Sequence, residues 1–229
     1  MPHKNEDGAH NRKESDGMTS KQKKRIMIGY GIYYVCLILA SIYCGIHQME
    51  GLKMAPVAAF TCFLVPLCLK ILKLKSTSVI VWINLIFAFI ASILGSMLGA
   101  YSLFMFDKFL HFFSGVFLSE LSFMVFCYLR EKTQFQDKKE KILCLLFVNA
   151  CNMMIAVFWE FFEYACLIFL NNDAIRHTTS GVHDSMTDML VACVGGILIT
   201  GWILRYFKTG KKNFWIHLNE EFYHLNFNS

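Results

Sequence analysis

The stretch that decides the fold is ILCLLFVNACNMMIAVFWEFFEYACLIFL, residues 142–170. As a helix rising about 1.5 Å per residue, it is long enough to cross the roughly 30 Å hydrocarbon core of a bilayer. Its only charged residues are Glu160 and Glu163. The whole chain is similar, with 55% hydrophobic and 17% charged residues, whereas about a quarter of the residues in soluble domains are charged. The sequence therefore predicts an all-α bundle of membrane-spanning helices.

Six apolar stretches are predicted to span the membrane. The second is short and contains Pro66, which a spanning helix tolerates when neighbouring groups satisfy the freed backbone. The nine cysteines include no C-x-x-C pair and are interpreted as small buried hydrophobes. The predicted spans are residues 26–46, 54–69, 79–104, 109–129, 142–170 and 186–207.

The distribution of positive charge predicts that both termini are cytoplasmic. In this topology only Lys53, Lys108 and Arg176, out of 22 lysines and arginines, fall on the outer side. The formal net charge of +5 follows from basic loops beside anionic lipid, and it requires no nucleic-acid partner. We expect a multi-pass protein of the bacterial plasma (inner) membrane. Its parts are a disordered basic cytoplasmic tail (1–25), a six-helix transmembrane domain (26–207) and a cytoplasmic tail (208–229) that is either interfacial or frayed.

Three of the predicted spans carry a stripe of polar residues on one helix face. Spacings of three, four and eleven residues keep side chains on the same side of a helix. An ionised residue at the bilayer centre costs at least about 2.5 kcal/mol, so several such residues are expected to face one another rather than lipid. We therefore expect one polar pocket near the outer face. Its contributors are Asp107 and His111 in the fourth span, Glu160 and Glu163 in the fifth, and Asp184 and Asp188 in the sixth. Asn149 and Asn152 share the face of the two glutamates and are interpreted as hydrogen-bonding partners of a neighbouring helix.

The residue types suggest two groups of roles in this pocket. An imidazole with carboxylates can perform acid–base chemistry or hold a divalent metal ion. The candidates for both tasks are His111, Glu160, Glu163 and Asp188. The candidates for substrate binding are Asp107, Lys108, Asp184 and Arg176, the last of which suits a phosphate group.

Simpler interpretations of several residues stay open. Asp107 and Asp184 are also suited to capping the amino termini of their helices. Arg176, like His177 and His183, is also interpreted as an ordinary polar residue of the outer loop, which is the simpler interpretation. Glu120 points away from His111 and lies deeper, so it is left out of the predicted site.

The three polar motifs together resemble a known family. DKFLHFFSG (107–115), WEFFE (159–163) and DSMTDMLVACVGG (184–196) follow the order D-K-x-x-H-F-x-x-G, W-E-x-x-E and D-x-x-x-D of the YjdF-like predicted bacterial membrane proteins. The set is more distantly similar to VanZ-like proteins, although Glu163 stands where those have glutamine. The first resemblance implies an uncharacterised membrane protein family. The second implies a link to glycopeptide-antibiotic resistance.

Three functions are compatible with the predicted pocket. The first is an enzyme that acts on a lipid head group or a lipid-linked envelope precursor at the outer leaflet, with membrane lipids as its partners. The second is a proton- or cation-coupled transporter, since buried His, Asp and Glu residues form proton relays. The third is a structural or partner-binding subunit, in which the polar groups only set helix register.

Overall fold

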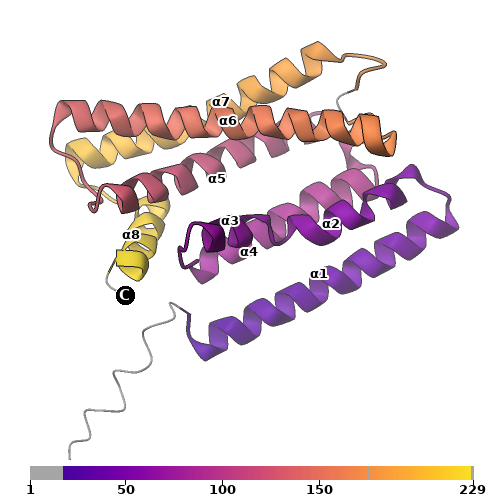
Figure 1. Cartoon of the computed structure of the whole chain (residues 1–229), viewed down its shortest axis with the longest axis horizontal. Coiled ribbons are helices and arrows are strands. Elements are labelled where there is room, and N and C mark those ends of the chain that lie inside the picture. The colour runs from indigo at the N-terminus through magenta and orange to yellow at the C-terminus, as the bar shows by residue number, and fades with distance from the viewer. Residues whose placement is uncertain (1–17, 175, 228–229) are drawn as a thin grey trace, which may run out of the picture.

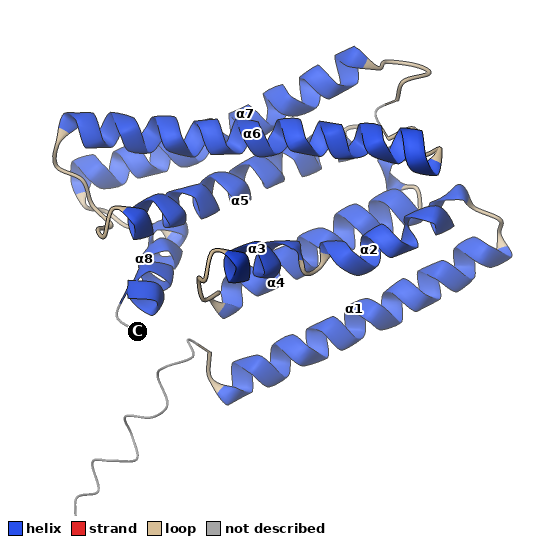
Figure 2. Cartoon of the chain, viewed as in Figure 1, coloured by secondary structure: helices blue, strands red, loops and turns tan. Residues whose placement is uncertain are grey.

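The structure is a computed structural model that describes residues 18–174 and 176–227 (Figure 1). The described residues form helices and loops, and none of them forms a strand (Figure 2). Six segments are long and apolar enough to cross a membrane. The predicted all-α, six-span fold is confirmed, whereas which side of the membrane the termini occupy stays a prediction. Most of the predicted tail at 1–25 lies outside the described residues. The six segments are Ser20–Ile46, Glu50–Ile71, Ser78–Met97, Phe106–Leu129, Lys138–Leu170 and Val182–Thr209.

The helices form two groups that lie side by side (Figure 1). The first group contains α1 (Ser20–Ile46), η1 (Glu50–Met54), α2 (Ala55–Thr61), α3 (Leu64–Ile71), α4 (Ser78–Ala88) and the π-helix η2 (Phe89–Met97). The second contains α5 (Phe106–Leu129), α6 (Lys138–Leu170), α7 (Val182–Thr209) and α8 (Phe214–Phe227). The short 3-10 turn η3 (Ala100–Ser102) connects them. The candidate site lies in the second group and at its boundary with the first.

The second span is broken, and the sequence explains where. Pro66 has no backbone N–H, so it cannot bond to the carbonyl of Cys62 four residues earlier. The helix stops at that point, with α2 ending at Thr61 and α3 beginning at Leu64. The freed Cys62 carbonyl accepts a hydrogen bond of 2.6 Å from Nδ2 of Asn84 in α4. A neighbouring helix thus satisfies the backbone group that the proline leaves open.

The third span ends earlier than predicted, at Met97 instead of residue 104. Gly99 has a φ of 81°, a left-handed conformation that glycine adopts readily, and it turns the chain back. A Cβ on Gly95 would lie 2.6 Å from the ring of Tyr101, so the missing side chain leaves room for that ring. The chain around Tyr101 therefore folds over the end of η2 and becomes a wall of the site.

Helices α5 and α7 cross in close contact at glycines of both helices. A Cβ on Gly115 would lie 2.1 Å from the carbonyl oxygen of Ala192, and one on Gly195 would lie 2.4 Å from that of Phe112. Only helices with glycine at these positions can approach so closely. This crossing lies about two turns below the polar residues at the starts of both helices, so it holds them near each other.

Other helix boundaries also differ from the predicted spans. Helix α1 begins before residue 26 because Thr19 forms a capping box with Gln22, and α6 begins before residue 142 because Asp137 caps it. The C-terminal segment, for which an interfacial and a frayed state were both open, contains helix α8. Its buried side chains, such as Ile216 and Phe222, pack into the apolar clusters beside α5.

Candidate functional site

The centre of the site is an ion-pair cluster between the first turns of α5 and α7. Nζ of Lys108 donates hydrogen bonds to Oδ1 of Asp184 at 2.8 Å and to Oδ1 of Asp188 at 2.7 Å. The two aspartates are four residues apart and therefore share one face of α7. Both are buried. The ammonium of α5 is thus held between two carboxylates of α7.

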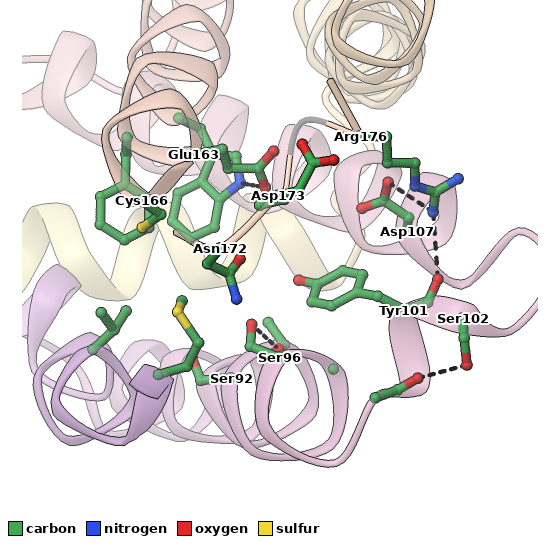
Figure 3. Close-up of a pocket in the computed structure, with 18 residues that line it drawn as sticks. Ser92, Ser96, Tyr101, Ser102, Asp107, Glu163, Cys166, Asn172, Asp173 and Arg176 are labelled. Carbon is green, nitrogen blue, oxygen red and sulfur yellow. Dashed lines mark hydrogen bonds and ion pairs between the residues drawn. The ribbon is translucent and has the colours of Figure 1, made fainter. Parts of the chain in front are cut away.

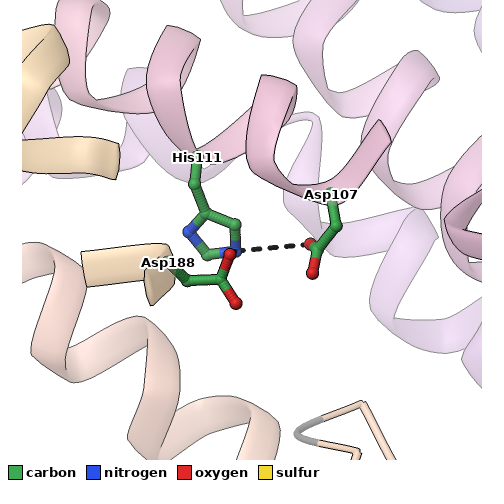
Figure 4. Close-up of side chains that lie close together, drawn as sticks. All are labelled: Asp107, His111 and Asp188. Carbon is green, nitrogen blue, oxygen red and sulfur yellow. Dashed lines mark ion pairs between the residues drawn. The ribbon is translucent and has the colours of Figure 1, made fainter. Parts of the chain in front are cut away.

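His111 lies next to this cluster, with a carboxylate on either side (Figure 4). Its Nε2 is 3.5 Å from Oδ1 of Asp107 and 3.7 Å from Oδ1 of Asp188. Both distances exceed the 2.7–3.2 Å that is usual for an N–H···O hydrogen bond. The imidazole is therefore close to two acceptors and tightly bonded to neither.

Asp107, His111 and Asp188 have the composition of a metal site. They offer one ligand atom each within 4.8 Å of one another, and all three residues are buried. Two carboxylates with an imidazole suit divalent transition metals. However, Lys108 donates to the same Asp188 oxygen that faces His111, so its ammonium competes for that oxygen. The donor set fits a divalent ion on condition that Lys108 moves toward Asp184.

Arg176 reaches the cluster from the loop between α6 and α7. Its Nη2 lies 3.7 Å from Oδ2 of Asp107, its Nε lies 3.4 Å from Oδ2 of Asp184, and Nη2 also donates to the carbonyl of Tyr101 at 3.3 Å. Asp173 stabilises this loop by accepting hydrogen bonds from the backbone N–H groups of His177 and Thr178. Although burial opposes the effect, these bonds and that from the Thr178 hydroxyl lower the pKa of Asp173.

The predicted helix caps are not formed. The N-cap residue of α5 is Met105 and that of α7 is Gly181, and neither helix end has a side-chain capping bond. Asp107 and Asp184 lie inside the first turns instead, where the helix dipoles favour negative charge. Their carboxylates face Lys108 and Arg176, as expected of site residues rather than of caps.

The two glutamates of α6 lie in different surroundings. Glu163 accepts a hydrogen bond of 2.8 Å from Nε1 of Trp159 and lines a cavity together with Asp107. Glu160 is buried, and neither of its carboxylate oxygens has a hydrogen-bond partner within the protein. Of the four predicted metal ligands, the structure brings together only His111 and Asp188. The third member of this compact group is Asp107, and neither glutamate belongs to it. Catalytic roles for Glu160 and Glu163 stay predictions.

The cavity beside the cluster has a volume of about 290 Å³ and is lined by a mixture of polar, charged and apolar groups (Figure 3). Asp107, Glu163 and Arg176 form one side of it, and Ser92 and Ser96 of the π-helix form another. π-helical turns recur at functional sites. The cavity therefore presents both signs of charge and several hydroxyl groups to a ligand.

Tyr101 is a site residue that sequence reasoning missed. It lines the cavity, and burial, together with the negative charges of Glu163 and Asp107, raises the pKa of its hydroxyl. That hydroxyl therefore stays protonated and able to donate. The residue lay inside a predicted span, and the only local signal was Gly99, which ends the helix two residues earlier.

The asparagines of α6 connect it to α7 below the site. Asn149 donates to Oγ1 of Thr200 at 2.8 Å, and Asn152 donates to the carbonyl of Ala192 at 3.0 Å. These are the interhelical hydrogen bonds expected of buried amides in a membrane bundle. They fix the register that places Glu160 beside the α5–α7 pair.

Comparison with known proteins identifies the family. Residues 30–209 match the family model described as predicted membrane protein (DUF2238). This agrees with the YjdF-like resemblance of the three motifs, whereas the VanZ-like resemblance is not supported. Comparison with curated proteins and with solved structures gives no match. Because the family model covers most of the chain, including all three polar motifs, the protein belongs to the DUF2238 family of predicted membrane proteins.

Proposed function

We propose that the protein is a membrane enzyme that acts on the head group of a lipid or of a lipid-linked envelope precursor, at the outer leaflet of a bacterial plasma membrane. The observation that carries the proposal is the convergence of Asp107, His111 and Asp188 beside a polar cavity in an otherwise apolar bundle. Ionisable groups are costly inside a membrane and mark functional sites there. A substrate that is itself a component of the membrane suits a site within the helix bundle.

The residues support proton transfer at a phosphate-bearing head group. His111 is the proposed general acid–base, because its Nε2 faces two carboxylates without being tightly bonded to either. Arg176 is 41% exposed and has N–H donors left over for a phosphate oxygen. Glu163, on the wall of the same cavity, is a second proton acceptor. When bound by Asp107, His111 and Asp188, a divalent cation would neutralise developing negative charge.

Turnover tests the proposal directly. Purified protein is reconstituted with phosphatidylethanolamine, phosphatidylglycerol or a polyprenyl diphosphate, with and without Mn²⁺, and the lipids are followed by mass spectrometry. We expect a new product that His111→Ala and Asp188→Asn abolish. His177→Ala, which changes an exposed loop histidine, is the matched control and keeps activity.

Two outcomes would contradict the enzyme proposal. If every lipid stays unchanged in the presence of folded wild-type protein, the enzyme is rejected. If His111→Ala and Asp188→Asn lose the folded protein itself, as measured by melting temperature, the cluster has a structural role. Elemental analysis of wild-type protein beside Asp188→Asn separates metal-assisted from metal-free chemistry, since a stoichiometric metal should disappear in the variant.

A second candidate function, proton-coupled transport, is favoured by a different observation. Buried polar atoms without a partner within the protein occur at successive depths of the second helix group, from the site toward α8. Such atoms are usually satisfied by ordered water, and water chains with carboxylates conduct protons. Glu120→Gln should then reduce proton flux into dye-loaded liposomes, and absence of flux in the wild type rejects transport. The residues concerned are Glu160, Asn152, Ser119, Glu120 and Asn219.

A further inference from the structure

A second cavity borders His111, and its lining is much more apolar than that of the first. Its volume is about 120 Å³, and apolar side chains such as Leu110, Phe117 and Ile155 dominate its walls. It extends along α5 from His111 past Ser114 to Phe117, which is more than one helical turn toward the middle of the bundle. Within the part of the chain that the structure describes, no Asp, Glu, Lys or Arg residue lines this cavity.

The polar and the apolar cavities adjoin each other. Four residues border both: Ala91, Ser92, Tyr101 and Trp159. Asp107 lines the more polar cavity, and His111, whose Nε2 is 3.5 Å from Asp107, lines the apolar one, so the acid–base cluster stands between the two. This is the arrangement that a molecule with a polar head and a hydrocarbon chain requires, with its reacting group at the junction.

The apolar cavity lies between the two helix groups, and part of its lining is also exposed on the outside of the bundle. On the side of the first group, Leu64 and Val65 of α3 line it, and Leu64 is 39% exposed at the surface of its span. On the side of the second group it is lined by α5 and α6. A chain in the surrounding membrane thus has a sideways route into the cavity that does not cross water.

We infer that this apolar cavity holds the part of a lipid hydrocarbon chain nearest to a head group that occupies the more polar cavity. The inference rests on the proposed function for the position of the head group, and it narrows the substrate to lipids that enter sideways from the membrane. Moving a chain from lipid to an apolar protein cavity changes little hydrophobic free energy, because both surroundings are apolar. The chain therefore orients the head group against His111, while polar contacts supply the affinity.

Photo-crosslinking tests this inference without requiring turnover. The protein is reconstituted with a phospholipid that carries a diazirine in its acyl chain, and the crosslinked residues are mapped by mass spectrometry. Ala156 lines the cavity and is 7% exposed, so lipid outside the bundle does not reach it, whereas Phe113 of α5 is 43% exposed and reports that outer lipid. We expect crosslinks at both kinds of position, on Ala156 and Phe117 as well as on Phe113.

A cavity-filling substitution supplies the matched comparison. Ser114→Leu fills the space and loses only a hydrogen bond to the carbonyl of His111 in its own helix. It should lower crosslinking at Ala156 by about tenfold, which corresponds to about 1.4 kcal/mol, and leave Phe113 unchanged. Gly201→Leu is the control, because a Cβ there meets nothing within 4 Å. Crosslinks confined to Phe113, or crosslinks at Ala156 that Ser114→Leu does not lower, would overturn the inference.

The two proposals fail in different ways. Crosslinking at Ala156 that Ser114→Leu removes, together with no turnover of any lipid, would leave the chain site standing and reject the enzyme. Turnover in the absence of cavity crosslinks would support the enzyme and reject the chain site, since it would mean that the head group alone is recognised.

Discussion

At the scale of single residues, Lys108 is the residue on which the site depends most. It lies among the buried residues Asp107, Asp184 and Asp188, with its side chain 17% exposed, and its ammonium bonds directly to the last two. These carboxylates face the interior, so they cannot recover their lost hydration if the lysine is removed. A buried charge left without its partner is more costly than the intact pair is stabilising.

Lys108→Gln should therefore lower the free energy of unfolding by about 3–5 kcal/mol, the cost typical of breaking a buried pair. Thermal unfolding in detergent measures this. Lys53→Gln is the control, because it removes a surface ion pair with Glu50 worth about 0–1 kcal/mol. Equal melting temperatures for the two variants would mean that water already reaches the Asp184 and Asp188 carboxylates.

At the scale of elements, the broken second span illustrates how one helix completes another. Pro66 opens the backbone at the Cys62 carbonyl, and the amide of Asn84 closes it. The same proline in a helix without such a neighbour would leave an unsatisfied acceptor in an apolar environment. The pair should consequently behave as one thermodynamic unit.

A double-mutant cycle on Pro66 and Asn84 tests that coupling. Asn84→Leu alone should cost about 1–3 kcal/mol, because it leaves the Cys62 carbonyl with only the long 3.4 Å hydrogen bond from the Tyr30 hydroxyl. In the background of Pro66→Ala, which restores the missing N–H, the same change should cost less by at least about 0.5 kcal/mol. Chemical unfolding of the four proteins provides the values. Strict additivity would show that the carbonyl finds another donor.

The α5–α7 crossing makes a second prediction at this scale. Gly115→Ala places a methyl group against the Ala192 carbonyl, so the helices must separate and the ion pairs of Lys108 must lengthen. We expect a large fall in melting temperature or the loss of folded protein. Gly201→Ala on α7 is the matched control, since a Cβ there meets no atom within 4 Å. Similar melting temperatures for these two variants would contradict a tight crossing.

At the scale of the whole molecule, the two helix groups are joined near both ends and leave cavities between them. At one end Arg176 bonds to the carbonyl of Tyr101, and at the other the side chain of Asn226 in α8 bonds to the backbone N–H and carbonyl of Lys75. Figure 1 shows α8 at the end of the bundle opposite the α6–α7 loop. The ion-pair cluster thus lies at the end of the bundle that carries the α6–α7 loop, away from α8.

The membrane orientation is the prediction that belongs to this scale. Because basic residues concentrate beside α8 and the α5–α6 loop, that end should be cytoplasmic. Cysteines introduced at Lys139 and at Thr178 in a cysteine-free background measure it in intact cells. A membrane-impermeant maleimide should label position 178 and leave position 139 unlabelled. Labelling of position 139 alone would invert the topology and move the site to the cytoplasmic leaflet.

The sequence predicted the fold class and the six spans because composition and the length of apolar runs are sufficient for both. It also named the candidate residues from which the cluster is formed. Helical spacing places Asp107 with His111, and Asp184 with Asp188, on single faces whatever the tertiary structure. Helix ends were less predictable, because the turn at Gly99 and the break before Pro66 depend on neighbouring helices.

By itself, the sequence determined that this is an all-helical membrane protein with a pooled set of charged side chains, because lipid tolerates neither open backbone groups nor isolated charges. Only the tertiary structure decided which of those side chains share a site. Rotation and depth of the helices bring Asp188 of α7 to the face of α5 that carries Asp107 and His111, and the turn after η2 brings Tyr101 into the wall of the cavity. Those choices follow from side-chain packing between helices, which no periodicity within one helix specifies.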